Sequence, residues 1–316
     1  SVASVSRVFN RLPNVRPELK ERVEQAARKL NYVPHAGARN LSMARTGAIG
    51  VVLPDLHGEF FSEMLRGMER EAALRQRHLL LSNMHLDIGH GIEALRNMRG
   101  RVDGLIVMAP HMNLDELFAH LPPSIPAVLL NCQDNGQGRP ELRVDNVAGA
   151  RAMVRHLLDC GRRAIVHIEG PAGNIEAADR SRGYAEAMEA AGLQPVILPG
   201  NFDEESGHSA VARLQADQLD VDAIFAANDM MAIGALVALR DMGVDVPSQV
   251  AVAGFDNIPL ARLISPGLTT MAVDIADMGA RGINRLVALI DGEAVPQMEL
   301  RQPGLIIRTS SQLSAA

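Results

Sequence analysis

Residues 48–76, AIGVVLPDLHGEFFSEMLRGMEREAALRQ, join a short apolar run to a longer stretch of mixed polarity. The run at 48–53 predicts a buried strand, because short apolar segments bounded by turn formers are typical of parallel sheets. Residues 60–76 carry apolar side chains at helical spacing, which predicts an amphipathic helix. A strand followed by a helix is the repeating unit of α/β folds.

The same unit recurs along the rest of the chain. Continuous apolar strands that alternate with helices predict parallel sheets covered on both faces. Eight such strands suit two doubly wound α/β domains better than a single sheet. The runs after the first are HLLLSN (78–83), DGLIVMAP (103–110), PAVLLN (126–131), RAIVHIEG (163–170), PVILPG (195–200), AIFAAND (223–229) and VAVAGFD (250–256).

The composition is that of a globular protein, with 316 residues of which 47% are apolar. Its two cysteines, Cys132 and Cys160, form no CxxC pair, so we expect neither a disulfide framework nor a cysteine-built zinc site. No apolar run reaches the roughly 18 residues that span a bilayer, and no hydrophobic signal core is present. These features predict a cytoplasmic protein with no membrane partner.

Positive charge is concentrated at the N-terminal end. The first 46 residues carry nine lysines and arginines against three glutamates, whereas the whole chain has a net charge of −6. A basic head on an acidic body favours contact of that end with a polyanion such as nucleic acid, although charge alone is equally compatible with a solvated basic helix. Residues 1–10 and 17–30 predict two helices in this head. Residues 35–46, which include Gly37, predict a third helix that is marginal on its own.

Common catalytic and cofactor motifs are missing from the sequence. It contains no GxxxxGK[ST] phosphate loop, no GxSxG elbow, no HExxH motif and no GxGxxG after the first strand. The ten histidines show no convincing metal-ligand spacing. We therefore expect no cofactor, no metal and no catalytic residue, and a binding function rather than an enzymatic one.

Polar residues follow several predicted strands, at the edge where doubly wound sheets bind ligands. Each alone is more often a helix cap or turn former than a ligand contact. Together they supply the paired donors and acceptors that suit the hydroxyl groups of a sugar. Phe60 and Phe61 belong either to the core or to a surface that stacks on a ligand ring. The polar residues are Asp55, Asn131, Asn228, Asp229 and Asp256.

Motifs spread over the whole chain carry a family resemblance. The head contains SVSRVFN (4–10) and VRPELKERVEQAARKLNYVPHAGARNL (15–41). The body contains D-N-x-x-G at 145–149, H-L-x-x-x-G at 156–161, R-x-x-G-Y at 180–184, N-D-x-x-A-x-G at 228–234, and G-F-D at 254–256 followed by L-T-T at 268–270. In this combination the chain resembles the LacI/GalR transcription regulators.

The resemblance implies a DNA-binding head whose helix-turn-helix lacks its first helix, followed by a hinge helix. Val2 and Ala3 would face base edges in the major groove. Leu41 would wedge into the minor groove and kink the DNA. The implied DNA-binding residues are Ser1, Val2, Ala3, Ser4, Ser6, Arg7, Asn10 and Leu41.

The resemblance also implies a body like a periplasmic sugar-binding protein, in which two subdomains enclose an effector and the chain crosses between them three times. The implied segments are the head at 1–33, the hinge at 34–46, an N-subdomain at 47–144 plus 275–298, and a C-subdomain at 145–274 plus 299–316. The implied effector-binding residues are Asp55, Phe60, Phe61, Asn131, Asn174, Glu176, Arg180, Phe225, Asn228 and Asp256.

Two positions bear on the class of effector. The purine-responsive branch of the family is similar to this chain at its aromatic positions and at Arg180. It departs at Asn174 and Glu176, where that branch has an arginine and a threonine. A glutamate suits hydroxyl groups and repels phosphate, so a neutral sugar or sugar derivative is favoured, with a purine-responsive regulator as the alternative.

We therefore expect an effector-controlled transcription regulator, most simply a repressor, that binds operator DNA as a homodimer. Effector binding would change the angle between the subdomains and thereby the stability of the hinge. The competing hypothesis is the solute-binding protein of a transport system, which would share the body. The basic head, Leu41 and the absence of an export signal all favour regulation.

Overall fold

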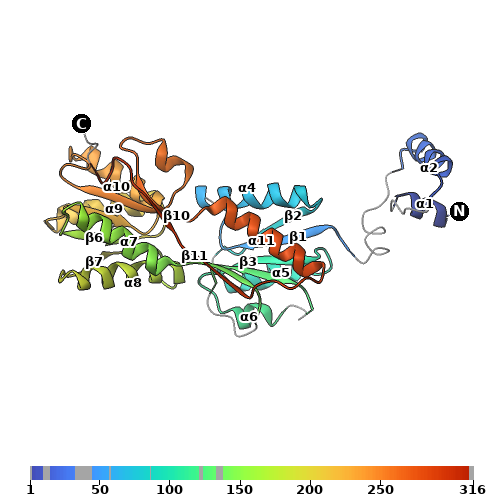
Figure 1. The fold of residues 1–316 in the computed structure, drawn as a ribbon, viewed down its shortest axis with the longest axis horizontal. Helices are drawn as coiled ribbons and strands as arrows, with labels where there is room; N and C mark the ends of the chain where they lie inside the picture. Colours follow the sequence, from blue (N-terminus) through green and yellow to red (C-terminus); the bar gives the residue numbers. More distant parts are fainter. Residues whose placement is uncertain are drawn as a thin grey trace.

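The computed structural model describes residues 2–9, 15–32, 45–56, 58–85, 87–120, 124–132 and 138–312. It shows a small helical head and a body of two α/β subdomains (Figure 1), which confirms the predicted fold class. Among the expected DNA-binding residues, Ser1, Asn10 and Leu41 lie outside the described residues, as does most of the expected hinge. No helix in the described ranges is long and apolar enough to cross a bilayer.

The head consists of α1 (Val2–Phe9) and α2 (Pro17–Lys29). Proline suits the first turn of α2 because its missing N–H would have no partner there. Val8 is buried, and the ring of Phe9 lies 6.0 Å from that of Tyr32. An apolar groove of about 340 Å³ runs between the two helices.

The first subdomain is built on a six-stranded parallel sheet in the order β11-β5-β4-β3-β1-β2. Alternate side chains of β1 point to opposite faces: Ile49, Val51 and Leu53 pack with α4 and α11, and Val52 packs with α5. The elements are β1 (Ala48–Leu53), α4 (Glu59–Leu74), β2 (His78–Asn83), α5 (Ile88–Met98), β3 (Gly104–Met108), α6 (Leu114–Phe118), β4 (Ala127–Leu130), β5 (Glu141–Val144), α11 (Ile275–Ile290) and β11 (Met298–Arg301).

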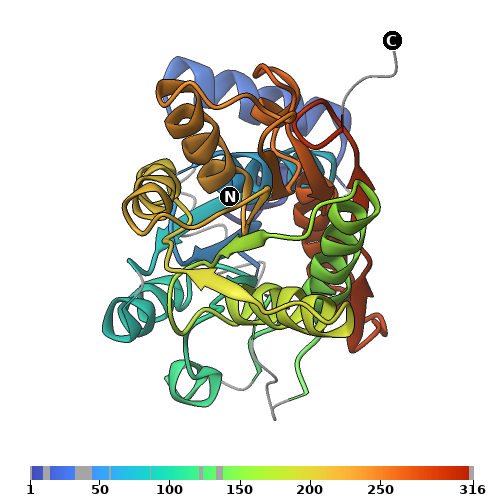
Figure 2. The same ribbon diagram turned by 90° about the vertical axis from the view of Figure 1, so that its left-hand side faces the viewer.

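The second subdomain has a sheet in the order β12-β10-β9-β8-β6-β7, in which only β12 runs antiparallel to its neighbour. Helices α7 and α8 pair with each other, as do α9 and α10 (Figure 2). The elements are α7 (Asn146–Asp159), β6 (Ile165–Ile168), α8 (Ile175–Ala190), β7 (Val196–Leu198), α9 (Glu204–Ala216), β8 (Ala223–Ala226), α10 (Asp229–Asp241), β9 (Ala251–Asp256), η1 (Pro259–Arg262), β10 (Thr269–Ala272) and β12 (Gly304–Ile306).

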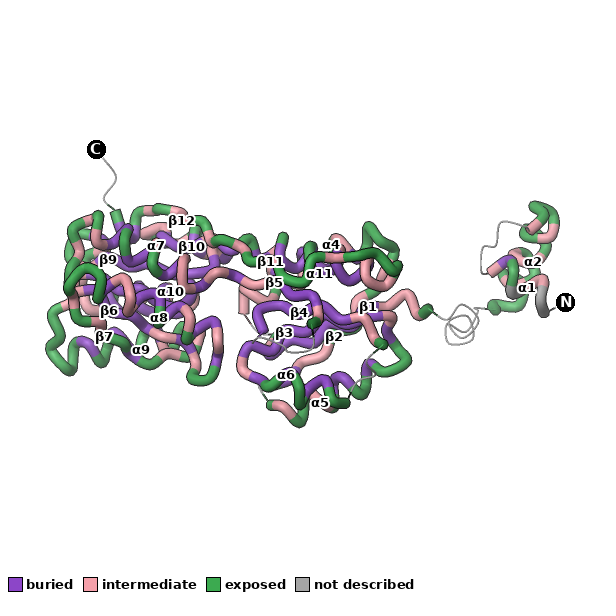
Figure 3. Tube along the Cα trace, turned by 60° about the horizontal axis from the view of Figure 1, so that its bottom comes forward, coloured by how far each residue is buried: buried purple, intermediate pink, exposed green. Residues whose placement is uncertain are grey.

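The chain passes between the subdomains three times, after β5, after β10 and after β11. The expected boundary between 298 and 299 is wrong, because β11 stays paired with β5 as far as Arg301. The ladder hydrogen bonds therefore hold residues 299–301 in the first subdomain. Buried residues gather along the strands of both sheets (Figure 3), so each subdomain has its own core.

Candidate functional site

A cavity of about 280 Å³ lies between the two subdomains. Its walls are the segments that follow β1 and β3 in the first subdomain and β6, β7, β8 and β9 in the second. The carboxyl ends of parallel strands converge there, which is where doubly wound folds bind their ligands. Eight of the ten expected effector-binding residues line it: Asp55, Phe60, Phe61, Asn174, Glu176, Arg180, Asn228 and Asp256.

Phe225 is not at the cavity, which corrects the expectation for this residue. Its side chain is fully buried in β8, and its ring lies 4.9 Å from that of His167. His167 in turn stacks on Tyr184, and burial lowers the pKa of this histidine to about 4. The strand alternation directs Phe225 into a neutral core, whereas Asn228, just beyond the end of β8, reaches the cavity.

Asn131 is also absent from the lining, but it contacts a residue that lines it. Its amide nitrogen donates to Glu176 Oε1 at 2.9 Å, and its Oδ1 accepts from Val144 N at 3.1 Å. The residue has φ 46°, a left-handed conformation that asparagine tolerates well. Asn131 belongs to the first subdomain and Glu176 to the second, so this hydrogen bond joins the two sides of the cavity.

Arg180, on α8, is the central cation of the site. Its Nε donates to Asn146 Oδ1 at 2.8 Å and its Nη1 to the Ala227 carbonyl at 2.6 Å. Nη1 also lies 3.2 Å from Asp256 Oδ1, and Nη2 lies 3.6 Å from Glu176 Oε1. These contacts hold the buried guanidinium in one orientation, as a planar fork of donors must be held to recognise a ligand.

The carboxyl groups around Arg180 are strongly perturbed. Burial raises the pKa of Glu176 to about 7, although the Arg180 guanidinium acts in the opposite direction. Burial likewise raises the pKa of Asp256 to about 6. Asp229 lies behind them, and burial together with the charge of Asp256 raises its pKa well above the usual value. Near neutral pH a fraction of these carboxyl groups is therefore protonated. A protonated carboxyl group can donate as well as accept a hydrogen bond.

Two polar residues of the site also cap helices. The Asn174 side chain accepts from Glu176 N at 2.9 Å, at the start of α8. The Asn228 side chain accepts from Met231 N at 2.9 Å, at the start of α10, and donates to the Phe202 carbonyl at 2.8 Å. The alternative interpretation of strand-end residues as helix caps is therefore correct for Asn228, and Asn174 is a helix cap as well. Both caps lie at the cavity.

Several lining residues were missed by the sequence analysis. Phe202 has φ 64°, and its ring packs so closely over Gly170 that an added Cβ there would lie 2.4 Å away. Phe202 lies in the segment that follows β7. The expectation that residues after strand ends line the ligand site therefore applies to this segment as well. The further missed residues include Glu59, Asn201, Asp203, Glu204 and Met230.

In the head, Arg7 is exposed and Ser4 is half-buried beside the groove between α1 and α2. The side chains of Val2, Ala3 and Ser6 lie outside the described residues. Within the described ranges no group of three or more histidine, cysteine or acidic side chains is arranged to hold a metal ion.

Comparison with known proteins matches both parts of the chain. Residues 1–35 match the family model of bacterial regulatory proteins, lacI family, and residues 154–311 match a periplasmic binding protein-like domain. Catabolite control protein A of Priestia megaterium is 31% identical over 96% of this chain and 93% of its own length. The ribose operon repressor of Halalkalibacterium halodurans is 32% identical over 99% of this chain and 94% of its own.

A solved structure agrees with these sequence relatives. The Lac repressor dimer bound to operator and the anti-inducer ONPF superposes with a TM-score of 0.90 at 26% identity, over 98% of this chain and 95% of that one. The agreement extends from the head through both subdomains. The chain belongs to the lacI family of bacterial regulatory proteins.

Proposed function

We propose that this transcription regulator binds operator DNA as a homodimer and that a neutral, hydroxyl-rich ligand, a sugar or sugar derivative, occupies the cavity and controls operator affinity. Its relatives support the regulatory part: one is a ribose operon repressor, and the matched Lac repressor dimer is bound to operator. Transport is disfavoured because residues 1–35 match a regulator's head.

The charge of the cavity lining is the observation that favours a neutral ligand. Among the described residues of its lining, six are acidic (Asp55, Glu59, Glu176, Asp203, Glu204 and Asp256) and Arg180 is the one arginine or lysine. Such a site repels phosphate and carboxylate groups but offers many acceptors to hydroxyl hydrogens. Phe60, Phe61 and Phe202 add apolar faces on which the C–H side of a sugar ring packs.

The same cavity explains how a ligand acts at a distance. Asp55 and Phe60 approach it from the first subdomain, whereas Arg180 and Asp256 approach it from the second. A ligand that contacts both sides favours one angle between the subdomains over others, by the difference in its affinity for the two states. The angle then sets the relative position of the two heads of the dimer, and with it the fit to operator DNA.

A ligand screen combined with DNA binding tests this proposal. We expect one neutral pentose, hexose or disaccharide to raise the melting temperature in a concentration-dependent way. The same sugar should change affinity for a duplex selected from a random library, measured at 0.15 M salt. Stabilisation by purine bases alone would contradict the sugar proposal, and the absence of any preferred duplex would contradict the regulatory one.

Glu59→Ala provides the matched test of the cavity. Glu59 lines the cavity and has no hydrogen bond or ion pair with the described residues, so its carboxylate is available to a ligand. Loss of one hydrogen bond to a charged group costs about 1.5–3 kcal/mol, so the sugar should bind roughly tenfold or more weakly. Glu69→Ala, an exposed change on the same helix α4, should bind it normally.

A further inference from the structure

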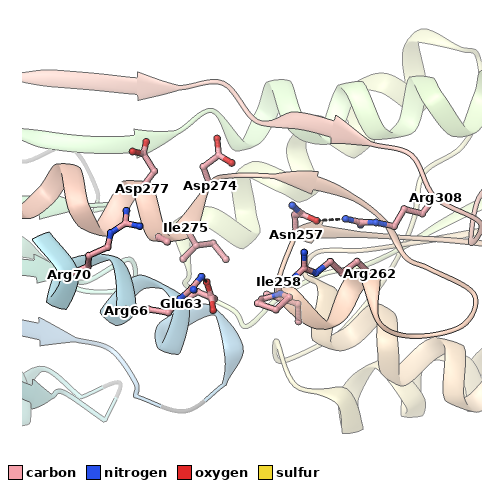
Figure 4. A pocket seen from close by; sticks show the side chains of 12 residues that line it. Glu63, Arg66, Arg70, Asn257, Ile258, Arg262, Asp274, Ile275, Asp277 and Arg308 are labelled. Atoms are coloured by element: carbon pink, nitrogen blue, oxygen red, sulfur yellow. Dashed lines mark hydrogen bonds and ion pairs between the residues drawn. The ribbon is translucent and has the colours of Figure 1, made fainter.

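A second cavity, of about 510 Å³, shares no lining residue with the first. It is formed by α4 and the start of α11 in the first subdomain, and by the segment after β9, η1 and Arg308 in the second. Figure 4 shows Arg66 and Arg70 on one side of this cavity and Arg262 and Arg308 on the other. It therefore also spans the junction between the subdomains.

The acidic residues of this second cavity are already compensated. Glu63 forms an ion pair with Arg66 within the cavity. Asp277 is paired with two arginines outside the lining, Arg281 at 2.8 Å and Arg301 at 2.7 Å. Asp274 lies 3.7 Å from the same Arg301. The ion pairs of these acidic side chains are therefore made with arginines other than Arg70, Arg262 and Arg308.

Three arginines of the lining form no ion pair with an acidic side chain in the part of the chain that the structure describes. Arg70 and Arg262 form no hydrogen bond or ion pair with the described residues, although both line the cavity. Arg308 is held in place by neutral groups: it donates to the Leu268 carbonyl at 2.6 Å and to Asn257 Oδ1 at 2.8 Å. Burial lowers the pKa of Arg308, the nearby Asp229 carboxyl acts in the opposite direction, and the positive charge of Arg262 lowers the pKa further.

We propose that this second cavity binds a small oxyanion with two or more negative charges, either a phosphate compound or a polycarboxylate. The planar donor forks of arginine match both groups. One of the three, Arg308, is already oriented, and an anion between the two sides relieves the repulsion between Arg262 and Arg308. The volume lies within the range of pockets that hold small metabolites.

The experiment uses pyrophosphate and citrate as probes of the two anion types. Each is titrated calorimetrically into the intact protein at constant ionic strength, because screening by added salt would otherwise mimic a loss of binding. We expect at least one probe to bind saturably, one per protomer. The double variant Arg70→Gln/Arg262→Gln should weaken that binding at least tenfold. The fold should tolerate it, since both side chains are exposed and form no hydrogen bond or ion pair with the described residues.

Two controls separate this site from general charge effects and from the first cavity. Arg240→Gln removes an exposed arginine of α10 that pairs with Asp241, and it should leave anion affinity unchanged. Glu59→Ala should also leave it unchanged. The proposal is overturned if neither probe binds saturably, or if the double variant and Arg240→Gln bind the probe equally well. Binding of only one probe supports it and identifies the anion type.

Discussion

At the residue scale, the first cavity is defined by buried carboxyl groups whose pKa values burial raises toward neutral pH. Glu176 is 6% exposed, and its Oε1 accepts from Asn131 at 2.9 Å and lies 3.6 Å from Arg180 Nη2. Arg180 has a structural role as well as a binding one, because it also holds the Ala227 carbonyl and Asn146. Its removal would leave Glu176 and Asp256 as buried like charges, so conservative changes are the informative ones.

Glu176→Gln should flatten the pH dependence of stability. The folded pKa of about 7 lies above the unfolded value of 4.5, so the folded state holds the proton more tightly. The contribution of Glu176 to stability therefore falls as the pH rises from about 4.5 to about 7. We expect the unfolding free energy of the wild type to fall by roughly 1–3 kcal/mol relative to Glu176→Gln over this interval, measured by urea denaturation.

Glu186→Gln is the matched control for this change. Glu186 lies on the same helix, α8, and forms a largely exposed ion pair with Arg151. Its replacement should preserve the wild-type pH profile. Parallel profiles for the wild type and Glu176→Gln would show that the buried carboxyl does not titrate as described.

At the element scale, pairs of helices pack backbone against backbone at glycines. An added Cβ on Gly279 of α11 would lie 2.4 Å from the Met64 carbonyl oxygen of α4. The same Cβ on Gly282, one turn further, would meet Ile106 and Leu130 at an ordinary 3.5 Å. This close contact matters for both cavities, because α4 supplies residues to each of them.

Gly279→Ala and Gly282→Ala should therefore have opposite effects. The first forces α4 and α11 apart, which costs about 1–3 kcal/mol of unfolding free energy. The second fits the space and removes the conformational freedom of glycine, so it should gain up to about 1 kcal/mol. Chemical denaturation of both variants measures the difference. Equal destabilisation would mean that helix packing does not distinguish the two positions.

At the scale of the whole molecule, the two subdomains are joined by three crossings and by contacts across the first cavity. Gln302 donates to Asp145 Oδ2 at 2.9 Å, which links the first and third crossings. Across the cavity, Asn131 donates to Glu176, and Ile175 N donates to the Pro110 carbonyl at 2.9 Å. Opening of the cleft must therefore break the cavity contacts while the crossings bend.

Asn131→Asp should make this opening pH-dependent. Above pH 7 the introduced carboxylate faces an ionised Glu176, and like charges at this distance repel. Below pH 6 Glu176 is protonated and donates to the new carboxylate, so the contact is restored. Small-angle scattering should give a larger radius of gyration at pH 8 than at pH 5.5. Asn113→Asp, which retains a helix cap on α6, should show no such change.

The apolar runs predicted all eight of the continuous strands, but β5, β10, β11 and β12 escaped detection. These strands lack a continuous apolar run, and β11 (MELR) is largely polar and partly exposed. Their strand character comes from pairing with residues far away in the chain, such as β11 with β5. No local pattern records such a pairing, which is also why the third crossing was placed too early.

The sequence by itself determined the class of fold, the division into head and body, and most of the first cavity. The fold class and the residues Asp55, Asn228 and Asp256 followed from strand ends, which are local features that parallel strands bring together. Asn174, Glu176 and Arg180 were expected from the family resemblance instead. Only the tertiary structure decided that Phe225 enters the core, that Asn131 reaches across to Glu176, and that Arg70 and Arg262 face one cavity. Those outcomes depend on which face of the sheet each side chain points to and on how the three crossings bring together segments that are distant in sequence.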